Sequence, residues 1–170
     1  LPYSKILLTS FTSLSIGHVV GLAALSSGAV RYRFYTRWGL SGGDVGRIVV
    51  FCGLTVALGI MTAVSLASLA SPTLVAELFG APRVLVVALA VALLGLVLLY
   101  VGLAARLHHP LRIRRFELPV PEVRLALGQI VVGTADFLIV SAVLHQMLSA
   151  SADVPYLPIA AAYVTANAAG

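Results

Sequence analysis

The sequence has 170 residues, of which 60% are hydrophobic and only 10% charged, and its mean hydropathy is +1.05. A soluble domain carries about 25% charged residues, and one of this size could not bury so much apolar surface in a single core. The composition therefore excludes a soluble globular domain and a peripheral membrane protein, and it predicts an integral membrane protein. The net charge of +5 fits this class, because basic residues of membrane proteins collect in cytoplasmic loops.

Five apolar segments follow one another along the chain. They cover residues 6–30, 48–76, 84–105, 125–152 and 157 onward. A spanning helix needs about 20 apolar residues, a length that the second, third and fourth segments meet. The first segment is rich in Ser and Gly, so a broken or re-entrant helix is an alternative to one span there. We therefore expect an all-α fold, a polytopic transmembrane helix bundle with about five membrane segments in a single domain over residues 1–170.

The connections between the segments are too short for a soluble domain. Pro72, Gly80 and Pro82 predict a turn at 71–82. The chain starts with Leu1 and stops inside an apolar run, so we expect it to be a fragment of a larger membrane protein. The single cysteine rules out an intrachain disulfide.

Lys and Arg are distributed unevenly between the two sides that these segments imply. If each segment crosses once, the loops at 31–47 and 106–124 share one side and hold nine arginines. The other side holds Lys5 and Arg83. This excess of nine basic residues over two predicts that both loops are cytoplasmic, because short cytoplasmic loops carry an excess of basic residues.

The stretch RYRFYTR (31–37) has two compatible interpretations. One is an orientation signal, with Tyr32, Tyr35 and Trp38 in an aromatic belt at the headgroup level. The other is a site for a lipid phosphate, because the planar guanidinium forms bidentate hydrogen bonds with phosphate oxygens. The second interpretation assigns headgroup binding to Arg31, Arg33 and Arg37. The later RIRR stretch (112–115) is typical of an orientation signal alone.

Asp136 is the one carboxylate near the middle of the fourth segment. A charge at that depth costs about 2.5–3.5 kcal/mol on insertion scales, so it usually faces a partner or a wet cavity. Gln129 and Gly133 lie seven and three positions before it, on nearly the same helical face. The alternative is a structural Asp held by a hydrogen bond. His18 and Asn167 also fall near mid-depth, where they either join Asp136 in one polar site or only hold helices together.

No catalytic motif is present. The sequence lacks HExxH, GxSxG, a phosphate-binding loop and paired cysteines, and His108 and His109 have no neighbouring ligands at metal spacing. We therefore predict no catalytic residue, no metal site and no cofactor.

Residues 17–55, GHVVGLAALSSGAVRYRFYTRWGLSGGDVGRIVVFCGLT, resemble the membrane region of bacterial aminoacyl-phosphatidylglycerol synthases/flippases of the MprF type, the lysylphosphatidylglycerol synthetase transmembrane family. LGQIVVGTADFLIVSAVL (127–144) is similar to the Asp-bearing helix of that family. VPYLPIAAAYVTANAAG (154–170) is similar to the start of its Tyr/Asn/Gly helix, which leads there into a His-Pro-Gly-Gly loop that this sequence does not contain.

The resemblance implies a lipid flippase domain that moves lysyl- or alanyl-phosphatidylglycerol to the outer leaflet and gives resistance to cationic antimicrobial peptides. A separate C-terminal domain of the parent protein would be the phosphatidylglycerol lysyltransferase or alanyltransferase. The implied location is the bacterial cytoplasmic membrane. The implied partners are the phospholipid, the synthase domain and further copies in a homo-oligomer, with no nucleic acid.

In this reading Arg31 and Arg33 take the phosphate and Asp136 faces the added amine. The polar path is completed by His18, Tyr163 and Asn167. Two alternatives remain open: a transporter of another anionic lipid, such as a polyprenyl phosphate or an ordinary phospholipid, and a passive membrane scaffold for a synthase domain. The first alternative needs the arginines but not Asp136.

Overall fold

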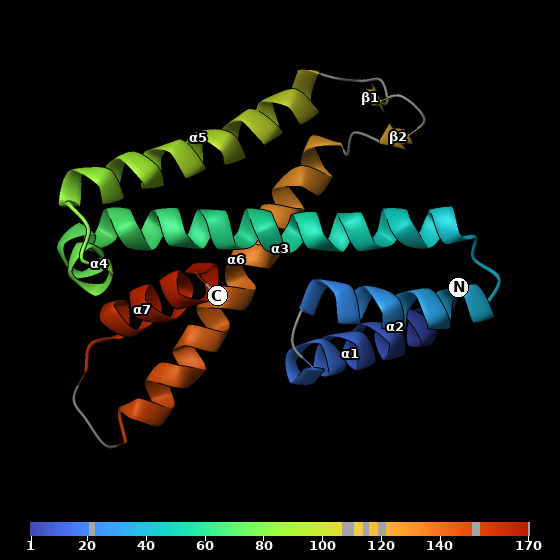
Figure 1. Ribbon diagram of the computed structural model, residues 1–170, viewed down its shortest axis with the longest axis horizontal. Helices are drawn as coiled ribbons and strands as arrows, with labels where there is room; N and C mark the ends of the chain where they lie inside the picture. The colour runs from blue at the N-terminus through green and yellow to red at the C-terminus, as the bar shows by residue number, and fades with distance from the viewer. Residues whose placement is uncertain (21–22, 107–110, 114–115, 119–121, 151–153, 170) are drawn as a thin grey trace. The chain divides into compact units, whose positions relative to one another are not determined.

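A computed structural model describes residues 1–20, 23–106, 111–113, 116–118, 122–150 and 154–169 (Figure 1). Over these ranges the chain is helical apart from two short strands. The elements are α1 (Tyr3–Val20), α2 (Ala23–Arg37), α3 (Gly42–Ala70), α4 (Pro72–Phe79), α5 (Arg83–Arg106), β1 (Leu111–Ile113), β2 (Phe116–Leu118), α6 (Val123–Leu148) and α7 (Tyr156–Ala169). The chain forms two compact units, an N-terminal unit of residues 1–54 and a C-terminal unit of residues 55–170, and α3 contributes to both.

The first apolar segment forms two helices, α1 and α2, that pack against each other as a helical hairpin (Figure 1). Small polar residues make the close approach of the two helices possible. Thr9 and Ser13 of α1 are fully buried, and their hydroxyls donate to the carbonyl oxygens of Lys5 (2.9 Å) and Ser10 (3.0 Å). Because each hydroxyl is satisfied within its own helix, the interface leaves neither donor unpaired. The broken-helix alternative for residues 6–30 is the one that the structure adopts.

The turn from α2 to α3 is encoded by four local residues. Gly39 has a φ of 89°, and its N–H and that of Leu40 bond to the carbonyl oxygens of Thr36 and Tyr35. This is the Schellman ending, for which glycine is favoured because the backbone is left-handed. Ser41 then caps α3. Its hydroxyl group accepts from the Asp44 N–H (3.2 Å), which caps the helix, and donates to the Asp44 carboxylate (2.6 Å).

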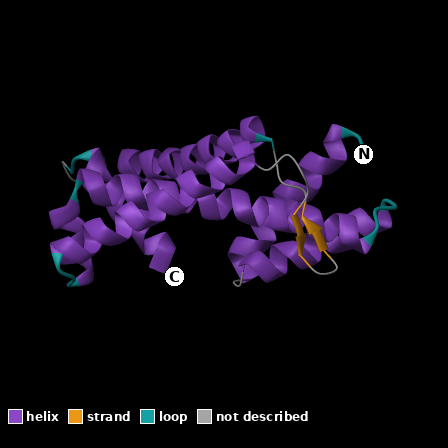
Figure 2. Ribbon diagram, turned by 90° about the horizontal axis from the view of Figure 1, so that it is seen from above, coloured by secondary structure: helices purple, strands orange, loops and turns teal. Residues whose placement is uncertain are grey.

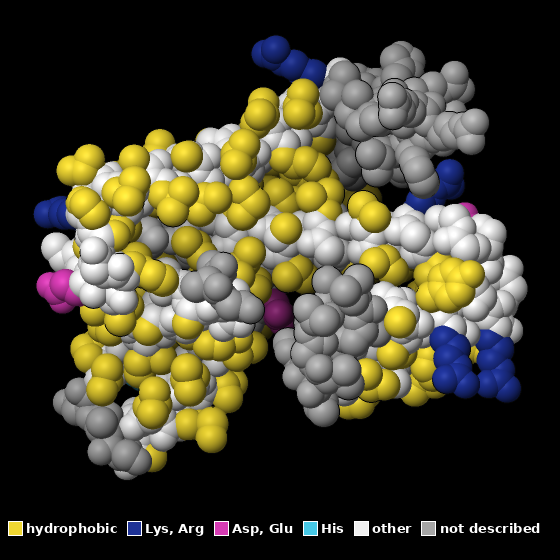
Figure 3. Space-filling view, in the orientation of Figure 1, with side chains coloured by type: hydrophobic (Ala, Val, Ile, Leu, Met, Phe, Trp, Pro, Cys, Tyr) yellow, Lys and Arg dark blue, Asp and Glu magenta, His cyan; other side chains and the backbone are white. Residues whose placement is uncertain are grey.

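Three helices, α3, α5 and α6, are long and apolar enough to cross a membrane, and the protein is a helical membrane protein. They correspond to the second, third and fourth predicted segments. The expected number of about five spans is not reached by the described helices. The first segment is divided between α1 and α2, and the 14 residues of α7 extend only about 21 Å, against about 30 Å of hydrocarbon. Hydrophobic side chains cover much of the visible surface of the C-terminal unit (Figure 3).

The predicted turn at 71–82 contains a helix. Pro72 occupies the start of α4, where its missing N–H costs nothing, and Gly80 ends the helix with a φ of 60°. The proline and glycine signals were therefore correctly placed, but they mark the two ends of an eight-residue helix. Val75 on this helix is buried with Val86 of α5 and Ala161 of α7, which anchors the α3–α5 connection in the core of the C-terminal unit.

The connection between α5 and α6, which is the second basic loop of the sequence, contains two strands and so differs from the expected all-α fold. Strands β1 and β2 pair antiparallel, with Arg112 opposite Glu117 and Ile113 opposite Phe116 (Figure 2). Each strand has three residues, so this β-hairpin is a short local element within the connection between α5 and α6.

Helices α3 and α6 touch backbone to backbone at Gly59 and Gly133. A Cβ added to Gly133 would lie 2.5 Å from the Thr55 carbonyl oxygen and 2.9 Å from the Gly59 Cα. A Cβ added to Gly59 would lie 2.4 Å from the Gly133 carbonyl carbon. Rigid backbone atoms occupy this space, so only glycine permits the contact, as at other close crossings of membrane helices.

We predict that Gly133→Ala destabilises the protein by about 1–3 kcal/mol, because the new methyl group must push two backbones apart. The matched control is Gly128→Ala on the same helix, where an added Cβ meets nothing within 4 Å. Alanine at 128 should be neutral or stabilising, since it is the better helix former. Thermal unfolding of the purified protein in detergent compares the two variants. Equal melting temperatures would contradict the close crossing.

Candidate functional site

The arginine cluster of the N-terminal unit is divided between two faces of α2. Arg31 is 7% exposed and Tyr35, one helical turn later, is 2% exposed, so both face inward. Arg33 and Arg37 are exposed and four positions apart, which places them together on another face. The three arginines therefore differ in environment, and Arg31 alone is buried.

Arg31 has no acidic partner within its unit. Residues 1–54 contain five basic side chains and a single acidic one, Asp44. That carboxylate is already engaged, because it accepts from Ser41 and lies 3.9 Å from Arg47. No described residue forms a hydrogen bond or an ion pair with the Arg31 side chain. A buried charge is costly unless it is paired, so the Arg31 guanidinium is prepared for an anion that the unit does not itself provide.

Lys5 lies at the same end of the hairpin as the arginines. Its ammonium group is 5.2 Å from the centre of the Trp38 ring, a distance at which a cation is attracted to the ring face. Trp38 also contacts the rings of Phe34 (5.7 Å) and Tyr35 (6.3 Å). Lys and Arg side chains are seen together at the end of the hairpin where the chain begins (Figure 3). The sequence predicts Lys5 and the arginines on opposite sides, whereas within the N-terminal unit Lys5 lies beside Trp38, next to the end of α2 that carries the arginines.

Asp136 lies on α6, one turn beyond the crossing at Gly133. Gln129 and Gly133 are buried, as expected of one packed face, whereas Asp136 is exposed. No hydrogen bond or ion pair to its carboxylate is formed by the residues that the structure describes. The structure thus gives no support to the alternative of a structural Asp held within the fold. The carboxylate is free to meet a polar or cationic group.

Gln129 is the centre of a polar contact that joins three helices. Its side-chain oxygen accepts from the Tyr100 hydroxyl of α5 (2.7 Å), and its amide nitrogen donates to the Thr55 hydroxyl of α3 (3.1 Å). The sequence signal for this cluster was Gln129 itself, a polar residue 3% exposed in a hydrocarbon-length helix. Tyr100 and Thr55 were not predicted, since a tyrosine or threonine in an apolar helix carries no indication of its partner.

The remaining predicted residues lie on α1 and α7. His18 belongs to α1, but its side chain is outside the described residues. Tyr163 is half-buried, and its carbonyl oxygen accepts from the Asn167 side-chain amide (2.9 Å). The arginines thus belong to the N-terminal unit, while Asp136, Tyr163 and Asn167 belong to the C-terminal unit.

The contact between α6 and α7 contains the other ordered polar group. His145 lies 3.1 Å from the Val154 carbonyl oxygen and stacks edge-on against the Tyr156 ring. The Tyr156 hydroxyl donates to the Leu138 carbonyl oxygen (3.1 Å) and lies 2.9 Å from the Ser141 hydroxyl. These bonds fix the start of α7 against α6. Within the described ranges, no group of three or more His, Cys, Asp or Glu side chains could hold a metal ion.

Comparison with known proteins shows no family for this chain. No family model matches the sequence. A protein of Synechocystis sp. (strain ATCC 27184 / PCC 6803 / Kazusa), known only as Uncharacterized protein slr0712, is 26% identical over 170 residues. The match covers all of this chain and 53% of the Synechocystis protein, so the chain spans about half the length of that relative.

We predict that Tyr100→Phe lowers stability by about 0.6 kcal/mol and by no more than about 1.7 kcal/mol, because hydrogen bonds between membrane helices contribute this much. Tyr3→Phe is the control, since Tyr3 is 76% exposed. Unfolding in detergent, followed by helical circular dichroism, compares the two. If Tyr100→Phe matched Tyr3→Phe, the three-helix contact would add nothing to stability.

Proposed function

We propose that this chain is the membrane part of a flippase of the aminoacyl-phosphatidylglycerol type. It would move lysyl- or alanyl-phosphatidylglycerol from the inner to the outer leaflet of a bacterial cytoplasmic membrane. A less negative outer surface then gives resistance to cationic antimicrobial peptides. The matched residues 17–55, 127–144 and 154–170 support this proposal through their resemblance to that family.

The observation that carries the proposal is the buried Arg31 without an acidic partner in its unit. A lipid phosphate is the anion best supplied at a membrane surface, and arginine binds it through two parallel hydrogen bonds. Arg33 and Arg37, exposed on the same helix, would attract anionic headgroups, with about 1 kcal/mol from each basic residue near the surface. Arg31 would then bind one of them.

The hairpin strengthens the proposed orientation. If the loops at 31–47 and 106–124 share one side of the membrane, Lys5, which lies beside Trp38, would bring the basic residues on that side to ten and leave Arg83 on the other. This asymmetry favours cytoplasmic loops at both positions. A headgroup would therefore enter from the leaflet in which the lipid is made.

Asp136 is proposed to meet the added amine during transfer. Phosphatidylglycerol that carries lysine or alanine has a positive group beyond its phosphate, and an unpaired carboxylate on a membrane helix suits it. His18, Tyr163 and Asn167 are proposed to complete the polar path. About five membrane segments would enclose that path.

The rest of the parent protein is part of the proposal. The transferase activity would belong to a C-terminal synthase domain, which acts as partner to this membrane domain, and a homo-oligomer is compatible with it. This chain would contribute transport and no catalysis.

The test compares Arg31→Gln with Arg33→Gln in the intact protein. Outer-leaflet aminoacyl lipid is measured in cells with a membrane-impermeant amine reagent, and total aminoacyl lipid by mass spectrometry. Loss of a charged hydrogen bond costs about 1.5–3 kcal/mol, so Arg31→Gln should lower exposure by about tenfold or more, with less than threefold for Arg33→Gln. Asp136→Asn should lower exposure while total lipid stays constant.

Three results would contradict the proposal. Normal exposure in Arg31→Gln at unchanged synthesis would remove the phosphate site. Sensitivity to Arg31→Gln but not to Asp136→Asn would indicate a transporter of another anionic lipid. Restored exposure when an unrelated membrane anchor replaces this chain would indicate a passive scaffold.

A further inference from the structure

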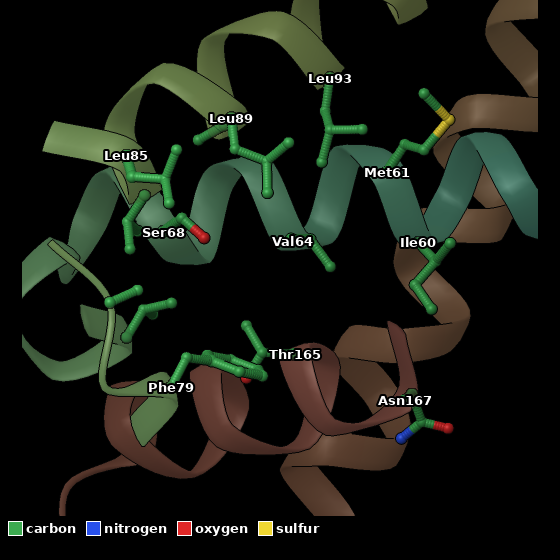
Figure 4. Close-up of a pocket in the computed structure, with 14 residues that line it drawn as sticks. Ile60, Met61, Val64, Ser68, Phe79, Leu85, Leu89, Leu93, Thr165 and Asn167 are labelled. Atoms are coloured by element: carbon green, nitrogen blue, oxygen red, sulfur yellow. The ribbon is translucent and has the colours of Figure 1, made fainter. Parts of the chain in front are cut away.

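A groove of about 510 Å³ lies in the C-terminal unit between α3, α4, α5 and α7 (Figure 4). One wall is a row of leucines on α5, Leu85, Leu89 and Leu93, four positions apart and therefore on one face. The opposite side includes Ile60 and Val64 of α3. The row of leucines extends over eight residues, or about 12 Å at 1.5 Å per residue.

The dimensions favour an occupant narrower than a protein helix. Spread over about 12 Å, this volume corresponds to a cross-section of roughly 40 Å², about half that of a helix 10 Å across. The groove lies beside α3 and α5, both of which are long and apolar enough to cross a membrane, so its surroundings are lipid chains. A single extended hydrocarbon chain fits both the width and the chemistry of the walls.

The groove contains one hydroxyl that lacks a partner. Three polar residues line it, and two are satisfied within α7: Thr165 donates to the Ala161 carbonyl oxygen (2.6 Å) and Asn167 to that of Tyr163 (2.9 Å). Ser68 is only 3% exposed, and its oxygen points into the space between α3 and α7 (Figure 4). No described residue forms a hydrogen bond with it. Because the Ser68 hydroxyl lines the groove and has no partner among the described residues, it can donate to a ligand that accepts a hydrogen bond.

We propose that the groove binds one acyl chain of a membrane glycerophospholipid, with the ester carbonyl of that chain accepting from Ser68. Ser68 lies two residues before the end of α3, near the depth of the ester groups, and the groove extends from it toward the middle of the helix. None of the lining residues is ionisable, so an ionised fatty-acid carboxylate would be left without a counter-charge. An uncharged ester has no such requirement.

This resident lipid goes beyond the proposed function. It uses neither the arginines nor Asp136, and its recognition depends on the acyl ester rather than on the headgroup. The probe is therefore a phosphatidylcholine with a photoreactive diazirine in its acyl chain, a lipid that is not the proposed substrate. Failure of this experiment would leave the flippase proposal intact. Failure of the flippase test would likewise leave the proposed acyl-chain site intact.

The intact protein is placed in nanodiscs with the probe, irradiated and mapped by peptide mass spectrometry. We expect labelling of the groove at Ile60 and Val64 to exceed labelling around Leu98, which is 63% exposed and on the opposite face of α5 from Leu89. Leu89→Trp should fill the groove and lower its labelling at least fivefold. Leu98→Trp, the matched control, should leave it unchanged.

A second pair of variants tests the hydrogen bond. Ser68→Ala should lower groove labelling about threefold or more, whereas Ser65→Ala should not, because the Ser65 hydroxyl already donates to the Met61 carbonyl oxygen (2.7 Å). A diazirine fatty acid should label the groove less than the phosphatidylcholine does. Groove labelling no higher than at Leu98, insensitivity to Leu89→Trp, equal loss in both serine variants, or stronger labelling by the fatty acid would each overturn the proposal.

Discussion

Hydrocarbon offers no hydrogen bond to a charge, and this constraint accounts for the shape of the N-terminal unit. Its five basic side chains include one, Arg31, that is buried, and its single carboxylate, that of Asp44, accepts from the Ser41 hydroxyl. A first segment that crossed once would leave Lys5 at the far side. The α1–α2 hairpin instead brings Lys5 to Trp38, at the end where α2 finishes with its arginines. Among the described side chains of the hairpin, Thr9 and Ser13 are buried with their hydroxyls satisfied, whereas Arg31 is buried without an acidic partner in its unit.

The C-terminal unit meets the same constraint in a different way. At Gly59 and Gly133 the α3 and α6 backbones touch, and one turn away Gln129 engages Tyr100 and Thr55, so close packing and a satisfied polar group occur together. On α6 the hydroxyl of Thr134 is buried without a partner among the described residues. Two further polar groups depart from this pattern: the carboxylate of Asp136 and the hydroxyl of Ser68. Both are without a partner among the residues described, and each is the basis of a proposed lipid contact, one with a headgroup amine and one with an acyl ester.

Composition and charge predicted the class of protein and the long spans closely. The third segment, expected at 84–105, is α5 at Arg83–Arg106. An uninterrupted apolar run of this length between two arginines favours a single membrane-spanning helix. The hairpin was foreseen only as an alternative, since Ser and Gly permit a break without requiring one. For the same reason the sequence did not indicate that Lys5 lies beside Trp38. Helical periodicity placed Asp136 on the same face as Gln129 and Gly133, but it could not show that Asp136 is exposed while the other two are buried. The groove depends on three consecutive helices, α3, α4 and α5, and on α7, which is distant from them in sequence, so no local pattern indicates it.

The central claim is that the first apolar segment enters and leaves through the same face. The most direct measurement is the side from which single cysteines at positions 5, 38 and 83 react with a membrane-impermeant maleimide, in a background where Cys52 is replaced by serine. The hairpin predicts that Lys5→Cys and Trp38→Cys react from one side of sealed vesicles and Arg83→Cys from the other. Reaction of Lys5→Cys from the side of Arg83→Cys would contradict it.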